Sequence, residues 1–306
     1  MEREYRENIY ILSGNESKYR EMFDAQGIKV CEDRSQATIL LADPPLAAEA
    51  LDEFPNLRWL QSTFAGVDAL MVDGLRRDYQ LTNIKGVFGQ LIAEYVMGYL
   101  LQGTRHFNDY KWHQQNREWA PKYYTSLSEM TMVILGTGMI GAHLAMVAKA
   151  FGMQVIGVSR SGQIPENSAF NEVYTSDDIT QAMAKADVVV STLPSTPETK
   201  GILCEATLSH CKEVLLFNVG RGSALKEDEL IRLIEQGAVK HAYLDVFVQE
   251  PLADDHPFWS YPNISITPHI AAVSFPEQVI TIFQENLARW RAHKLLNFSI
   301  DFIRGY

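Results

Sequence analysis

The chain has 306 residues, of which 46% are hydrophobic and 21% are charged. This length suits two domains, and the composition excludes a disordered protein. Lys and Arg number 27 against 38 Asp and Glu, so the formal net charge is -11. That balance argues against a protein that binds nucleic acid or an anionic membrane, because such affinity comes largely from Lys and Arg. A small anionic substrate stays compatible, since one buried Arg can outweigh the mean field locally.

The first part of the chain alternates short apolar runs with helical stretches. Strands are predicted at 8–14, 37–43 and 57–63, and helices at 18–27 and 45–54 between them. Such alternation is typical of parallel α/β structure. From Gly89 to Trp119 the pattern is helical without proline, and Gly103 offers a break, so two consecutive helices are expected.

A second α/β series follows. The segment 131–141 is predicted as a strand that runs into a glycine turn, and 142–152 as the helix after it. Further strands are predicted at 153–160, 186–194, 213–220 and 241–247, with helices at 229–237 and 274–294. Two α/β halves with helices between them favour a two-domain enzyme.

Cysteine usage and the N-terminus predict the compartment. Cys31, Cys204 and Cys211 are widely spaced, whereas a secreted scaffold would hold more cysteines. The N-terminus has no apolar core followed by a cleavage site, and no run of about 18 apolar residues occurs. We therefore expect a cytoplasmic protein with no leader and no membrane span.

Three glycines after the strand at 131–135 predict a dinucleotide site. Gly136, Gly138 and Gly141 form G-x-G-x-x-G between an apolar strand and a helix, which is the context that such a site requires. Gly136 allows the tight turn, Gly138 lets the backbone approach a pyrophosphate, and Gly141 permits close packing of helix and strand. The amides of Met139 and Ile140 would point at phosphate from the helix N-terminus. A glycine-rich turn with no ligand is the alternative.

The end of the next strand indicates the cofactor. An NAD enzyme typically places an acid about 20 residues after the glycines, to hold the ribose 2′-hydroxyl. That place is taken by Ser159, Arg160 and Ser161, which can donate hydrogen bonds or pair with a 2′-phosphate. The sequence therefore favours NADP over NAD. A surface Ser/Arg loop on an enzyme of dual specificity is the alternative.

Three polar residues follow the later strands. Arg221 comes after the strand at 213–220, Glu250 after that at 241–247, and His269 further along. Ligands bind beyond the carboxyl ends of strands in a doubly wound sheet, so one crevice would receive all three. Arg suits a carboxylate, protonated His can donate a proton to a developing alkoxide, and Glu favours the imidazolium. Taken singly, they also suit a turn residue, a cap and a structural histidine.

Six stretches then give the chain a family resemblance. They are AGVD (65–68), LGTGMIG (135–141), LPSTPETKGIL (193–203), NVGRG (218–222), LDVFVQEPL (244–252) and TPHIAA (267–272). In these the chain resembles the D-isomer-specific 2-hydroxyacid dehydrogenases. The resemblance implies an α/β protein of two Rossmann-like, doubly wound parallel-sheet domains. The cofactor domain (100–270) is inserted into a discontinuous, flavodoxin-like substrate domain (1–99 and 271–306).

The resemblance also implies residue roles. Arg221 would bind the carboxylate and carbonyl, Glu250 would support the histidine, and His269 would be the acid–base catalyst, with Arg221 and His269 touching both substrate and cofactor. Asp245 would bind the nicotinamide amide. The backbone amides of the loop Phe64, Ala65 and Gly66 would hold the substrate carboxylate. Further cofactor contacts are expected, by their place in the motifs, from Leu193, Pro194, Val219, Gly220, Ala271 and Ala272.

Two departures narrow the expected function. Ser159 and Arg160 replace the family's common acid, as in the NADP-dependent glyoxylate/hydroxypyruvate reductases, and the stretch 269–277 also resembles that subgroup. The chain ends just after its last helix, so an effector-binding C-terminal domain is not expected. We expect an NADPH-dependent reductase of small 2-keto acids to D-2-hydroxy acids. A reductase of bulkier 2-keto acids and a non-enzymatic dinucleotide-sensing regulator are the alternatives.

The predicted linking helices carry histidines and tryptophans. His106 and His113 have no third ligand at suitable spacing, so no metal site is expected there. Packing of this arm, with Trp112 and Trp119, against a second copy of the chain is favoured instead. A homodimer is therefore expected.

Overall fold

The computed structural model describes residues 7–303, and the chain divides into two compact units. Unit 1 comprises Met1–Val87 and Ser274–Tyr306, and unit 2 comprises Phe88–Val273. Unit 2 is therefore inserted between two separate parts of unit 1. The expected domain ends at residues 1–6 and 304–306 lie outside the described residues.

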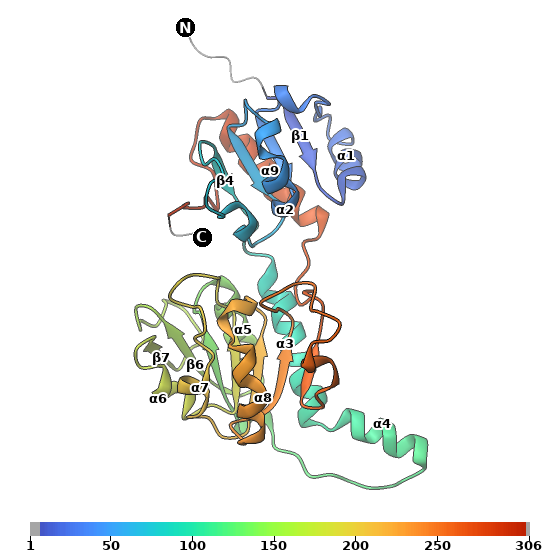
Figure 1. Cartoon of the computed structure of the whole chain (residues 1–306), viewed down its shortest axis with the longest axis vertical. Coiled ribbons are helices and arrows are strands. Elements are labelled where there is room, and N and C mark those ends of the chain that lie inside the picture. Colours follow the sequence, from blue (N-terminus) through green and yellow to red (C-terminus); the bar gives the residue numbers. More distant parts are fainter. Residues whose placement is uncertain (1–6, 304–306) are drawn as a thin grey trace. The chain divides into compact units, whose positions relative to one another are not determined.

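Unit 1 is built on a parallel four-stranded sheet in the order β1-β2-β3-β4 (Figure 1). An isolated parallel bridge joins Ile9 to Val30 on the side of β1 away from β2. Strand β1 therefore has a backbone neighbour on both sides. The helices of this unit are amphipathic or short, and Pro44 opens α2 at a position where its missing N–H costs nothing. The elements are β1 (Ile9–Leu12), α1 (Glu16–Asp24), β2 (Ile39–Ala42), α2 (Pro44–Ala50), β3 (Trp59–Ser62), β4 (Gln80–Thr82) and α9 (Pro276–Arg291).

The C-terminal helix α9 completes the core of unit 1. Figure 1 draws it in red-orange against the blue strands of the sheet. Phe283 stacks on Trp59 with ring centroids 5.2 Å apart, and it also packs on Phe23 of α1. Buried Asn286 donates a hydrogen bond of 3.0 Å to Gln61 of β3. A segment far away in the sequence is thus tied to the sheet by both apolar and polar contacts.

Unit 2 has a parallel seven-stranded sheet in the order β11-β10-β9-β8-β5-β6-β7. From β5 the chain winds outward through β6 and β7, then crosses back to β8 and winds the other way. The switch point lies between β5 and β8, where open α/β sheets bind their ligands. The elements are α3 (Phe88–Thr104), α4 (Phe107–Asn116), β5 (Thr131–Leu135), α5 (Met139–Ala150), β6 (Gln154–Ser159), β7 (Glu172–Thr175), α6 (Ile179–Met183), β8 (Val188–Ser191), α7 (Glu205–Leu208), β9 (Val214–Asn218), α8 (Glu227–Glu235), β10 (Val239–Leu244) and β11 (Ile264–Ile266).

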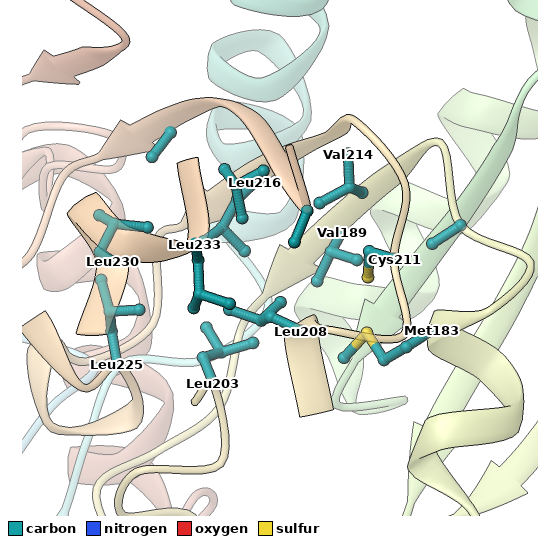
Figure 2. Packing of buried hydrophobic residues seen from close by; sticks show 14 of the residues in the cluster. Met183, Val189, Leu203, Leu208, Cys211, Val214, Leu216, Leu225, Leu230 and Leu233 are labelled. Carbon is teal, nitrogen blue, oxygen red and sulfur yellow. The ribbon is translucent and has the colours of Figure 1, made fainter. Parts of the chain in front are cut away.

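Both faces of this sheet are covered. Successive side chains of β5 enter opposite cores: Val133 and Leu135 pack in one cluster, Met132 and Ile134 in the other. Figure 2 shows part of the first cluster, in which leucines from the helices meet Val189, Val214 and Leu216 of the strands. Each such side chain contributes roughly 1.5–3 kcal/mol on burial. The continuous apolar runs of these strands follow from this double burial.

Helices α3 and α4 are the expected helical pair. The break falls next to the predicted Gly103, since α3 ends at Thr104 and His106 adopts a left-handed φ of 56° before α4. Ile92 and Val96 of α3 pack in the core of unit 2, and the units divide before Phe88, whereas the prediction divides the domains after residue 99. The second division lies after Val273, against a predicted 270. No helix within residues 7–303 has both the length and the apolarity to cross a membrane.

The sequence prediction missed three of the strands and two short helices. Strands β4, β7 and β11 have three or four residues each, and α6 and α7 have five and four. Strand β7 is an edge strand of the sheet with no buried residue, so it has no apolar run to detect. The other strands were predicted in their correct order, including β1, β2, β3 and β8 with four residues each.

Candidate active site

The glycine turn connects β5 to α5 at the switch point. Gly136 has a φ of 100°, a backbone angle that residues with a side chain rarely adopt. A Cβ on Gly141 would stand 1.9 Å from the carbonyl oxygen of Gly136, so only glycine allows the helix to pack this closely on the turn. Gly138 is the N-cap of α5 and has open space where its Cβ would be. The three glycines therefore occupy three different physical roles, as the motif predicts.

This turn fits the phosphates of a dinucleotide. The open space at Gly138 lets a ligand reach the backbone, and Met139 and Ile140 are the first residues of α5. The first N–H groups of a helix have no acceptor within it, and they carry the positive end of its dipole. A pyrophosphate placed there would be met by these amides rather than by a side chain.

The residues predicted to contact the 2′ position, Ser159 to Ser161, lie at the carboxyl end of β6, with Ser159 as its last residue. The Ser159 hydroxyl accepts from the Gly162 amide at 3.2 Å and that of Ser161 from Gln163 at 3.3 Å, so both hydroxyl protons are left to donate. Arg160 is exposed. The pKa of Glu198 is lowered by backbone and Thr196 hydrogen bonds and then by the Arg160 charge.

The other residues predicted to line the cofactor also lie at the carboxyl ends of strands. A Cβ on Gly220 would stand 2.5 Å from the carbonyl oxygen of Leu193, so the loops after β8 and β9 are in close contact. The Ala271 amide donates to Asp245 at 2.9 Å. These residues are Leu193 and Pro194 after β8, Val219 and Gly220 after β9, and Ala271 and Ala272 after β11.

Arg221 lies in the loop after β9, which packs against the loop after β10. Its Nη1 donates to the Gly220 carbonyl at 2.8 Å, and Asn218 donates to the Arg221 carbonyl at 3.0 Å. A Cβ on Gly222 would stand 1.9 Å from the backbone carbon of Phe247, so this glycine lets the Arg221 loop reach the loop after β10. That second loop carries Glu250.

Glu250 and His269 form a hydrogen-bonded pair. His269 Nδ1 and Glu250 Oε2 are 2.7 Å apart, and the Phe247 amide donates to the other Glu250 oxygen at 2.9 Å. The His269 side chain is 49% exposed and that of Glu250 is 35% exposed, so a substrate can reach both. Since Nδ1 is engaged, Nε2 is the nitrogen left for proton transfer.

The charges of this group shift both pKa values. The hydrogen bond to Glu250 raises the pKa of His269, partly opposed by burial and by the Arg221 charge. Burial raises the pKa of Glu250, but the hydrogen bonds from His269 and from the Phe247 amide outweigh it, so the net shift is downward. The pair therefore favours a carboxylate beside an imidazolium, which is the state a proton donor needs.

Asp245, directly after β10, is buried and accepts hydrogen bonds from the segment that carries His269. Its Oδ1 accepts from the Thr267 hydroxyl at 2.6 Å and from the Ile270 amide at 2.8 Å. Its Oδ2 accepts from Ala271, and one further lone pair of that oxygen can accept a nicotinamide amide, the predicted role.

The loop Phe64, Ala65 and Gly66 belongs to unit 1. The Phe64 amide already donates to the Ser62 hydroxyl at 2.9 Å, and Asn83 donates to the Ala65 carbonyl at 2.6 Å. Because a trans peptide points its N–H opposite its C=O, the bond to Ala65 turns the Gly66 amide away from Asn83. Of the three predicted amides, that of Phe64 is therefore occupied within the loop.

Sequence reasoning missed several residues that hold these groups in place. Thr192 donates to the Leu135 carbonyl at 3.0 Å beside the glycine turn, and Tyr95 bonds Thr267 at 2.7 Å. Asn83 supports the loop of unit 1. Thr192 directly precedes Leu193 and Thr267 lies within the quoted stretch TPHIAA, whereas Tyr95 lies on a helix that was predicted only as a linker.

The histidines of the linking helices contact local groups. His106 Nε2 lies 2.9 Å from the Tyr123 carbonyl, and its Nδ1 lies 3.5 Å from Asp109. Within residues 7–303, no three His, Cys, Asp or Glu side chains are arranged to hold a metal ion.

Comparison with known proteins gives one consistent family. Residues 97–271 match the model of the D-isomer specific 2-hydroxyacid dehydrogenase, NAD binding domain. A glyoxylate/hydroxypyruvate reductase A from Serratia proteamaculans is 33% identical over 285 residues, which cover 90% of this chain and 89% of that protein.

Solved structures agree in fold. A D-isomer specific 2-hydroxyacid dehydrogenase family protein from Aeromonas salmonicida is 42% identical with a TM-score of 0.89, covering 97% of this chain and 99% of that one. An NADPH-dependent glyoxylate/hydroxypyruvate reductase from Sinorhizobium meliloti, in complex with NADP and sulfate, is 25% identical with a TM-score of 0.88, covering 98% and 100%. The chain belongs to the D-isomer specific 2-hydroxyacid dehydrogenases.

Proposed function

We propose that this enzyme reduces small 2-keto acids, glyoxylate and hydroxypyruvate first among them, to D-2-hydroxy acids with NADPH. The observation that carries the proposal is the His269–Glu250 pair at 2.7 Å, with Arg221 near enough to shift both pKa values. A proton donor and a guanidinium beside a dinucleotide-binding sheet are what carbonyl reduction requires.

The residues divide the reaction between them. The bound nicotinamide supplies the hydride. Arg221 holds the substrate carboxylate and polarises the adjacent carbonyl. His269 gives the Nε2 proton to the carbonyl oxygen as it becomes a hydroxyl, and Glu250 keeps the imidazole charged and oriented. The neutral His269 then takes a new proton from solvent.

The choice of NADPH rests on the loop after β6. Ser159, Arg160 and Ser161 supply donors and a positive charge where an NAD enzyme typically has an acid. The structures similar to this chain include one from Rhizobium etli in complex with NADP and one from Xanthobacter autotrophicus in complex with NADPH. The choice of substrate is supported by the similarity to the glyoxylate/hydroxypyruvate reductase A of Serratia proteamaculans.

One assay separates the candidate functions. NADPH oxidation is measured against glyoxylate, hydroxypyruvate, pyruvate, branched 2-keto acids and phenylpyruvate, and then repeated with NADH. We expect the highest kcat/KM for the two smallest polar acids with NADPH. Preference for phenylpyruvate would replace the substrate proposal with a bulkier class, and NADPH binding without turnover would indicate a dinucleotide-sensing regulator.

We also propose that two copies of the chain associate through the arm formed by α4 and residues 117–126. Helix α4 has no buried residue, and Trp112, Trp119 and Tyr123 are each more than half exposed. Exposed aromatics gathered on one segment are typical of an interaction surface. Light scattering should give a dimer for the wild type and a monomer for Trp119→Ser/Tyr123→Ser, whereas a monomeric wild type would refute the arm's role.

We place the enzyme in the cytoplasm. Cys31, Cys204 and Cys211 are free thiols, which suits a reducing compartment. Cell fractionation with antibody detection tests this, and recovery with a secreted or membrane fraction would overturn it.

A further inference from the structure

The segment that carries His269 is held by hydrogen bonds to one buried carboxylate, that of Asp245. His269 has a left-handed φ of 54°, and its amide donates to the backbone carbonyl of Asp245 at 2.9 Å. The Asp245 side chain accepts from Thr267, Ile270 and Ala271. The tight turn at the histidine therefore depends on where the Asp245 carboxylate is held.

A proton count along this network gives its direction. Thr267 Oγ1 lies 2.6 Å from Asp245 Oδ1 and 2.7 Å from the Tyr95 hydroxyl. A threonine hydroxyl has one proton, and a carboxylate can only accept, so Thr267 donates to Asp245. The Tyr95 hydroxyl must then donate to Thr267. The order is Tyr95 to Thr267 to Asp245.

Tyr95 is itself held by its neighbours. It lies on α3, and its ring meets that of Tyr99 edge to face with centroids 5.0 Å apart. Tyr99 packs on Tyr243 of β10, which stacks on Phe217 of β9 at 4.5 Å. This row of rings fixes the Tyr95 hydroxyl relative to the strands whose ends carry Asp245 and Arg221.

We propose that Tyr95 and Thr267 are positioning residues that hold His269 at its hydrogen bond to Glu250, acting through the Asp245 carboxylate. The inference rests on the proposed function for its effect on turnover. Neither residue is expected to touch substrate. The charged groups around His269 are Glu250 and Asp245, which stabilise its imidazolium, and Arg221, which destabilises it. Loosening the turn weakens the closest of these contacts, that with Glu250, so the His269 pKa should fall toward its ordinary value.

Four variants test this. Tyr95→Phe removes the first donor, and Thr267→Val removes the donor to Asp245 at nearly constant shape, whereas Thr267→Ser restores a hydroxyl. Tyr99→Phe is the matched control, because it deletes a hydroxyl one turn along α3 in the same row of rings. The His269 pKa is measured by NMR titration of labelled histidine, with the signal assigned by its loss in His269→Gln. Rates and melting temperatures are measured alongside.

We expect Tyr95→Phe to lower kcat about 3- to 10-fold, the range set by one neutral hydrogen bond. Thr267→Val should lower it further, because it leaves a buried carboxylate short of a donor. Both variants should lower the His269 pKa and move the alkaline limb of kcat/KM to lower pH, while Thr267→Ser and Tyr99→Phe stay near wild type.

Two results would overturn the inference. One is a His269 titration in Tyr95→Phe and Thr267→Val that matches Tyr99→Phe, even if their melting temperatures fall, since that outcome leaves only a packing role. The other is an equal loss in Tyr99→Phe. A wild-type enzyme that reduces no 2-keto acid refutes the proposed function instead, and the NMR titration, which needs no substrate, still decides the positioning role.

Discussion

The segment 267–271 and the loop 159–161 both lie at the carboxyl ends of strands of the unit 2 sheet, yet they are built differently. In the first, the Thr267 hydroxyl and the backbone amides of Ile270 and Ala271 donate hydrogen bonds to the buried Asp245 carboxylate. The second is largely exposed, and its serines accept single local amides at 3.2 and 3.3 Å. One segment is fixed to the core, and the other rests on its own short turn.

This difference corresponds to the chemistry proposed for each segment. Proton transfer requires the donor within hydrogen-bond reach of the reacting oxygen, and small misplacements cost rate. A guanidinium that pairs with a phosphate tolerates adjustment, because the arginine side chain is long and the phosphate presents several oxygens. Changes in the first segment should therefore affect every substrate and cofactor, and changes in the second only the choice of cofactor.

Removal of the proton donor should give the largest effect. His269→Ala is expected to lower kcat/KM about 10²- to 10⁴-fold, the contribution of a positioned acid–base group. The melting temperature should change little, because the side chain is half exposed. Steady-state kinetics with glyoxylate measure this, and His210→Ala, another exposed histidine, is the control. Near-wild-type turnover in His269→Ala would contradict the assigned role.

Neutralising the partner of that donor should come next and should change the pH profile. Phe247 and His269 bond different oxygens of Glu250, and in Glu250→Gln one of these oxygens becomes an NH2 group that cannot accept, so one hydrogen bond is lost together with the negative charge. We expect kcat/KM for reduction to fall about 10- to 100-fold near neutral pH, the range for a hydrogen bond to a charged group.

The sign of the shift follows from the wild-type pair. Glu250 raises the pKa of His269, so the imidazolium needed for reduction persists to higher pH in the wild type. Glu250→Gln should move the alkaline limb of the reduction profile to lower pH. The acid limb of hydroxy-acid oxidation, which needs neutral His269, should move the same way. Limbs that stay in place would argue against the pair as the titrating group.

The placement of Arg221, Glu250 and His269 could be predicted because each follows a strand of one parallel sheet. Strand ends meet at one edge, so Arg221, Glu250 and His269 could be expected to lie together. The glycine turn was predictable for a similar reason, since each glycine meets a steric demand set by its immediate neighbours. Local spacing was sufficient in both cases.

The support of the trio could not be predicted. Tyr95 and Thr267 are separated by 172 positions, and nothing in the spacing of α3 marks that tyrosine among its apolar neighbours. The occupied amide of Phe64 likewise depends on the rotamer of Ser62, which is a tertiary property. Such contacts arise when helix and loop pack, so they require the structure.

A cofactor-specific loss is expected from the exposed loop. Arg160→Ala should raise KM for NADPH about tenfold or more, because it removes a charge-assisted contact with a phosphate. KM for NADH should be almost unchanged, which makes NADH the internal control. An equal rise for both cofactors would place Arg160 outside the 2′ site.

The smallest effect should come from Glu198 in the loop after β8. Backbone and Thr196 hydrogen bonds lower the pKa of Glu198 most, and the Arg160 charge lowers it a little further. That glutamate competes with a 2′-phosphate for the arginine and also repels the phosphate directly. Glu198→Gln should therefore lower KM for NADPH by roughly twofold at low salt, with no change for NADH. Because both groups are exposed, the gain should vanish near 1 M salt, where the screening length is about 3 Å. A gain that survives high salt, or that appears with NADH, would mean that the substitution reshapes the loop rather than removing a competing charge.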